Sequence, residues 1–89
     1  MKDEEIEQLL LDNDLTDTAY LTGYNYYSAI IGYTDDGNLV YSYEKMIEYL
    51  IKEAEMTQEE AIEWIDYNVL RAIPYMGDTK PIIVYELIQ

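Results

Sequence analysis

The stretch TQEEAIEWIDYNVLRAIPYM, residues 57–76, predicts a helix with a defined start and a defined end. Thr57 and Glu60 have the spacing of a capping box, in which each side chain accepts a hydrogen bond from the backbone N–H of the other residue. Pro74 cannot donate the hydrogen bond that a continuing helix needs, so we expect the helix to end near Ile73. The apolar residues between these limits recur at helical spacing, which predicts that one face packs on a core.

Three side chains of this helix are candidates for a special role. Asn68 falls on the apolar face, where a buried amide needs a hydrogen-bond partner, so we expect it to point into the core and lock the helix in place. Arg71, near the C-terminal end, is expected to stabilise the fold by pairing with a carboxylate. Trp64 flanks the apolar face, and the sequence leaves open whether it forms a core edge or an exposed anchor.

The segments on either side of this helix predict an α+β domain that spans residues 1–89. The turn sequence DDGN, residues 35–38, is typical of a hairpin between two strands. The sheet is expected to be small and antiparallel, with three to four strands and with helices packed on one face. The expected element order is α-β-β-β-α-α-β, with helices at 3–12, 43–55 and 57–73 and strands at 18–21, 28–33, 39–43 and 81–88.

The composition excludes several classes of function. The chain has 19 acidic and 5 basic residues, a net charge of −14, which repels phosphates and anionic lipid headgroups. We therefore expect the chain not to bind nucleic acid or membranes directly. The sequence contains no long apolar run and no secretory signal, so we expect a cytoplasmic location in a bacterial host. Without cysteine or histidine, the usual nucleophile–histidine pairs and zinc sites are excluded. We expect no enzyme activity, no metal and no cofactor.

The carboxylates themselves are candidates for binding a basic protein. DNA carries one charge per roughly 1.7 Å of its axis, and carboxylates one or two turns apart on helices can imitate such a row. The expected partner is a basic nucleic-acid-binding protein, which the chain would inhibit by DNA mimicry. The acids of residues 3–17 form a second candidate face. The carboxylates proposed for the main face are Glu44, Glu48, Glu55, Glu59, Glu63 and Asp66.

The uncharged, tyrosine-rich segment at 18–34 supports an alternative function. Its Tyr, Asn, Ser and Gly residues favour adaptable contacts at a low cost in conformational entropy. Tyr24, Tyr26 and Tyr27 are the candidate anchors, either on a partner protein or on a second copy of the chain in a homodimer. In this hypothesis the chain is a non-catalytic interaction module, and its acidity serves solubility only.

Three stretches of the chain carry a resemblance to a known group of proteins. The motifs are EEAIEWIDYNVLRAIPYMG at 59–77, PII at 81–83 and VYSYEKMIEYL at 40–50. Over about residues 30–88 the chain resembles small acidic, mostly uncharacterised proteins from phages, prophages and other mobile elements of Gram-positive bacteria. The resemblance brings no catalytic residues. It implies a role against host defence, as in anti-CRISPR and anti-restriction proteins, and hence a host defence nuclease as the partner.

Overall fold

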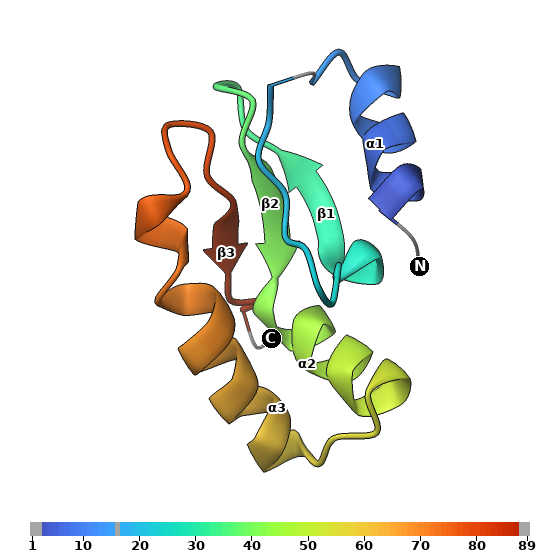
Figure 1. Cartoon of the computed structure of the whole chain (residues 1–89), viewed down its shortest axis with the longest axis vertical. Coiled ribbons are helices and arrows are strands. Elements are labelled where there is room, and N and C mark those ends of the chain that lie inside the picture. The colour runs from blue at the N-terminus through green and yellow to red at the C-terminus, as the bar shows by residue number, and fades with distance from the viewer. Residues whose placement is uncertain (1–2, 16, 88–89) are drawn as a thin grey trace.

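The computed structural model describes residues 3–15 and 17–87 and confirms the predicted α+β class. Figure 1 shows α1 beside β1, whereas α2 and α3 form a helical hairpin at the end of the sheet rather than covering one face of it as expected. The helices and strands are α1 (Asp3–Asp12), β1 (Ile30–Tyr33), β2 (Leu39–Ser42), α2 (Tyr43–Glu53), α3 (Gln58–Ile65) and β3 (Ile82–Val84). The shorter turns are the 3-10 turns η1 (Tyr27–Ala29) and η3 (Ile73–Tyr75) and the π-helical turn η2 (Asp66–Leu70).

Local signals in the sequence account for the start of α3 and for the β1–β2 hairpin. Thr57 Oγ1 accepts from the Glu60 N–H at 3.2 Å and Glu60 Oε1 accepts from the Thr57 N–H at 2.9 Å, which confirms the capping box. In the hairpin, the Thr34 N–H donates to the Asn38 carbonyl oxygen at 2.8 Å. Gly37 has a φ of +86°, a conformation that only glycine adopts without strain.

The sheet has the strand order β1-β2-β3 and is mixed rather than antiparallel. β1 and β2 pair antiparallel through the hairpin, but β2 and β3 run parallel, with Tyr41 opposite Ile83. The prediction of an antiparallel sheet is therefore wrong for β3. The reason lies in the connection, because α2 and α3 together form the long crossover that two adjacent parallel strands require.

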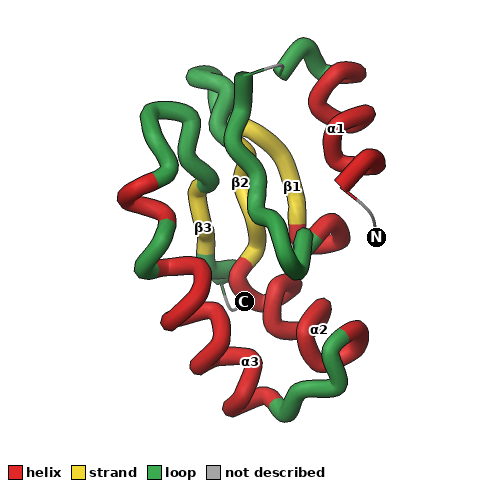
Figure 2. The backbone as a smooth tube through the Cα atoms, in the orientation of Figure 1, coloured by secondary structure: helices red, strands yellow, loops and turns green. Residues whose placement is uncertain are grey.

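The strand predicted at 18–21 is not a strand. Residues 17–26 instead cross one face of the sheet as a loop (Figure 2). The backbone of this loop forms a hydrogen bond with a side chain instead of with a neighbouring strand: the Leu21 N–H donates to the Tyr41 hydroxyl at 3.1 Å. The loop brings the tyrosine-rich segment over the sheet and close to the helical hairpin.

The hydrophobic core lies where this loop, the sheet and the helices meet. Within α3 only Ala61 and Ile65 are buried, so most of the surface of that helix stays free for contacts. The buried apolar residues of the core are Ile6, Leu10, Leu21, Tyr26, Ala29, Leu39, Tyr41, Met46, Tyr49, Leu50, Ala61, Ile65 and Val69.

Candidate protein-binding site

A π-helical turn, η2, interrupts the helix that the sequence predicts to run to Ile73. Its backbone hydrogen bonds span five residues instead of four, so successive side chains advance by a smaller angle around the helix axis. Asn68 therefore turns away from the core. The prediction of a buried Asn68 is wrong: the side chain is exposed, and its Nδ2 donates to the Trp64 carbonyl oxygen at 3.1 Å.

A contact between two aromatic rings joins the tyrosine-rich segment to α3. The ring centroids of Tyr24 and Trp64 lie 5.4 Å apart at an interplanar angle of 72°, the edge-to-face arrangement that aromatic pairs favour. Trp64 is 38% exposed, so its ring packs against Tyr24 and still offers part of its surface to solvent. The two regions that the sequence proposed as separate binding sites therefore meet at Trp64.

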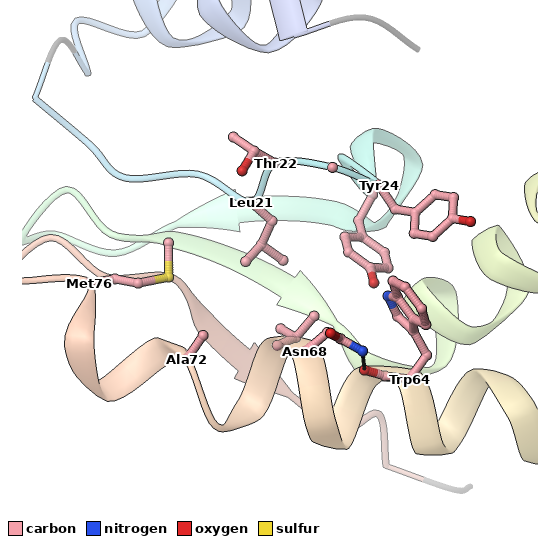
Figure 3. Close-up of a pocket in the computed structure, with 10 residues that line it drawn as sticks. Leu21, Thr22, Tyr24, Trp64, Asn68, Ala72 and Met76 are labelled. Atoms are coloured by element: carbon pink, nitrogen blue, oxygen red, sulfur yellow. Dashed lines mark hydrogen bonds between the residues drawn. The ribbon is translucent and has the colours of Figure 1, made fainter.

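An open groove, which we call the aromatic groove, lies between the tyrosine-rich segment and the helical residues after Glu63. In Figure 3, Leu21, Thr22 and Tyr24 lie on one side of it, and Trp64, Asn68 and Ala72 lie on the other. Its volume is about 510 Å³, within the range of small-ligand sites. Its lining residues are Leu21, Thr22, Gly23, Tyr24, Tyr26, Trp64, Asn68, Val69, Ala72 and Met76.

A second groove, the acidic groove, lies on the other flank of Trp64. Trp64 and Asn68 line both grooves, so a molecule bound in one would lie next to the other. The acidic groove has a similar volume, about 510 Å³, and contains two carboxylates. Its lining residues are Met56, Glu60, Glu63, Trp64, Tyr67 and Asn68.

Arg71 lies beside this groove, with its guanidinium carbon 4.2 Å from the centroid of the Tyr67 ring. This is a cation–π contact rather than the carboxylate pair that the sequence predicted. Tyr67 stands one helical turn before Arg71, so the ring is the neighbour that the helix itself supplies. Arg71 still has a structural role, but it does not neutralise a carboxylate of the acidic groove.

Three of the six predicted carboxylates lie along the exposed side of the α3 region. Glu59 and Glu63 are exposed on α3, and Asp66 is exposed at the start of η2. They are spaced four and three residues apart, which places them on neighbouring turns of one helix. Glu60 lies near them, but its carboxylate is used in the capping box.

The other three predicted carboxylates are not part of this row. Glu44 is half-buried, and its Oε1 accepts a hydrogen bond from the Glu86 N–H at 2.9 Å. Glu48 lines a depression on α2 together with Lys45 and Lys52, whose positive charges offset its own. Glu55 is exposed in the turn before α3. The continuous acidic face predicted from Glu44 to Asp66 is therefore reduced to its α3 part.

Tyr26 is placed differently from the exposed anchor that the sequence predicted. Its side chain is only 1% exposed, and its ring packs against Tyr49 with centroids 5.3 Å apart. Burial raises the pKa of Tyr26 to about 12, and a hydrogen-bonding interaction with the Trp64 side chain offsets part of this rise. Tyr26 is thus part of the core, and it also lines the aromatic groove.

The backbone at Tyr26 is also unusual. Its φ of 51° is left-handed, which costs a non-glycine residue roughly 1–2 kcal/mol. Next to it, the Oδ1 of buried Asn25 accepts from the Tyr27 N–H at 3.0 Å and from the Tyr49 hydroxyl at 3.4 Å. Tyr27 itself is half-buried. Asn25 was not predicted as a site residue, because its only signal in the sequence is a polar side chain within an uncharged segment.

Two buried tyrosines, Tyr26 and Tyr41, give a matched test of the hydrogen bonds that their hydroxyl groups form. Tyr41→Phe leaves the Leu21 N–H without its partner, so we expect it to lower the free energy of unfolding by about 1–3 kcal/mol. Tyr26→Phe removes only the interaction of this hydroxyl with the partly exposed Trp64 side chain and leaves no backbone group unpaired, so the loss should be smaller, below about 1 kcal/mol. Urea denaturation of both variants measures the difference, and an equal loss in the two would contradict it.

The described residues contain no group of three or more acidic side chains arranged to hold a metal ion. None of the described helices is long and apolar enough to cross a membrane. The chain matches no protein-family model, no curated protein and no solved structure.

Proposed function

We propose that the chain is a protein-binding module whose α3 region docks on a basic surface of another protein. The observation that carries this proposal is the row of exposed carboxylates, Glu59, Glu63 and Asp66, next to the partly exposed ring of Trp64. The residues that dominate binding energy at protein interfaces are enriched in Trp, Tyr and Arg, so Trp64 is a suitable anchor beside the acidic row. The net charge of −14 favours a positively charged partner and repels nucleic acid.

The finer proposal is that the partner is a nucleic-acid-binding protein of the bacterial host, and that binding inhibits it. A basic cleft that accepts DNA phosphates would also accept a row of carboxylates, so occupancy of the cleft by this chain would exclude the nucleic acid. The resemblance to small acidic phage proteins points to a nuclease of a host defence system. Both proteins would meet in the host cytoplasm.

The tyrosine-rich segment has a supporting role in this proposal. Tyr24 is engaged with Trp64 and Tyr26 is buried, so these rings act within the chain rather than as free anchors for a homodimer. Their contribution to binding is the wall that they supply to the aromatic groove. A homodimer is therefore not the function that the geometry favours.

A capture experiment with two charge-matched variants tests the proposal. The test variant carries Glu59→Gln, Glu63→Gln and Asp66→Asn, and the control carries Asp35→Asn, Asp36→Asn and Asp78→Asn at exposed positions outside both candidate acidic faces, so both lose the same charge. Tagged proteins are incubated with host lysate and washed with rising salt or with competing DNA. We expect the wild type and the control to retain a basic DNA-binding protein that salt and DNA release, and the test variant to lose about 90% of it, because three close ion pairs contribute roughly 1 kcal/mol or less each.

Capture that is equal for the test variant and the control would reject the α3 region as the binding face. A captured partner that is not basic, or that neither salt nor DNA releases, would reject charge mimicry itself. Circular dichroism of each variant confirms that the fold is intact before capture is compared.

A further inference from the structure

The aromatic groove has a chemistry of its own, which the acidic row does not explain. Three aromatic side chains line it, from Tyr24, Tyr26 and Trp64, and its other polar side chains, Thr22 and Asn68, each carry an oxygen that can accept a hydrogen bond. Its lining holds no charged residue, but it adjoins the acidic groove at Trp64 and Asn68. An apolar aromatic site within a negative field favours a cation that can also lie against a ring.

We infer that the aromatic groove binds an arginine side chain from the basic partner. The inference rests on the proposed function and names the group that the partner inserts. The guanidinium would lie against the exposed part of the Trp64 ring, and the methylene stem would lie along the apolar residues Leu21, Val69 and Met76. The chain already shows this mode of contact nearby, where its own Arg71 lies over Tyr67 at 4.2 Å.

One hydrogen-bond acceptor gives the groove its selectivity. The Asn68 Nδ2 donates to the Trp64 carbonyl oxygen, which leaves the Asn68 Oδ1 to accept from a ligand. Asn68 is exposed and lines the groove beside the Trp64 ring, so a ligand can contact the ring and this oxygen together.

Arginine fits this arrangement better than lysine does. The guanidinium is planar and presents five N–H donors in a fixed fork, so it can donate to the Asn68 Oδ1 while its face stacks on the Trp64 ring. The lysine ammonium is a compact and strongly hydrated charge that would leave either the ring or the Asn68 Oδ1 uncontacted. A neutral isostere such as citrulline keeps the shape but loses the attraction to the negative field.

The test is a titration of ¹⁵N-labelled protein with three capped peptides at low ionic strength: Gly-Arg-Gly, Gly-Lys-Gly and Gly-citrulline-Gly. The chain has one Trp, so its single indole N–H resonance reports on the groove. We expect the arginine peptide to shift this resonance and the Asn68 side-chain amide saturably, with a millimolar Kd. The lysine and citrulline peptides should bind at least about fivefold more weakly.

A variant locates the contact. Asn68→Ala should weaken binding of the arginine peptide by about threefold to tenfold, because it removes the Asn68 Oδ1. Tyr33→Phe, on β1 and 52% exposed, is the control and should bind as the wild type does. Equal binding of the three peptides, or unchanged binding by Asn68→Ala, would overturn the inference.

The outcomes also separate this inference from the proposed function. If the arginine peptide does not bind but the α3 charge variant still loses the captured partner, the partner docks through the acidic row alone and only the inference fails. If the peptide binds as expected and no basic partner is captured, the groove recognises arginine and the proposed function fails.

Discussion

The domain should lose stability steeply in alkali, with a loss of roughly 3–5 kcal/mol in the free energy of unfolding between about pH 10 and pH 12. Burial raises the pKa of both Tyr26 and Tyr41 from 10.0 to about 12. Above pH 10 the unfolded chain releases these two protons while the folded chain keeps them. Rising pH therefore favours the unfolded state. The stability that depends on the two protonated tyrosines is fully present only below about pH 10.

Urea denaturation at a series of pH values measures this loss. Tyr26→Phe and Tyr41→Phe should each remove about 2–3 kcal/mol of the pH dependence, because the substituted residue can no longer ionise. Tyr75→Phe is the control, since Tyr75 is 89% exposed and should leave the dependence unchanged. If the two core variants lose stability with pH as steeply as the control does, the buried tyrosines are not its cause.

The parts of the fold that could be predicted are those set by neighbouring residues. The capping box at Thr57 and Glu60 and the hairpin turn at Gly37 depend on side-chain and backbone groups within a few positions, so their sequence signals are specific. The direction of β3 depends instead on where the α2–α3 crossover ends. The 18–21 segment has strand-like residues, but the Tyr41 hydroxyl gives its backbone a partner outside the sheet.

The candidate site was predictable only in pieces, for the same reason. The sequence identifies the carboxylates of α3 and the tyrosines near Tyr24, but not that Trp64 joins them. The π-helical turn has no clear local signal, and Asn68 within it lies on the wall of two grooves rather than in the core. The site is formed by contacts between segments that are far apart in the sequence, and such contacts cannot be predicted from the residue pattern of a single sequence.

The most damaging substitution in α3 should be Ile65→Ala, with a loss of about 2–5 kcal/mol in the free energy of unfolding. Ile65 is 0% exposed and belongs to the core, directly before the π-helical turn. A domain of this length has a total stability of only roughly 4–13 kcal/mol, so the variant would be near the limit of folding. Ile62→Ala is the matched control: Ile62 is 38% exposed on the same helix, and its loss should cost less than about 1 kcal/mol.

Urea denaturation followed by Trp64 fluorescence compares the two variants, and the result bears on the site as well as on the fold. Ile65 fixes the buried side of α3 and thereby turns Glu63 and Trp64 outward. Ile65→Ala should therefore weaken capture of the partner although it removes no carboxylate, whereas Ile62→Ala should capture as the wild type does. A larger loss of stability for Ile62→Ala would mean that α3 packs through its other side. The acidic row and the aromatic groove would then not share one surface, and the proposed docking face would have to be abandoned.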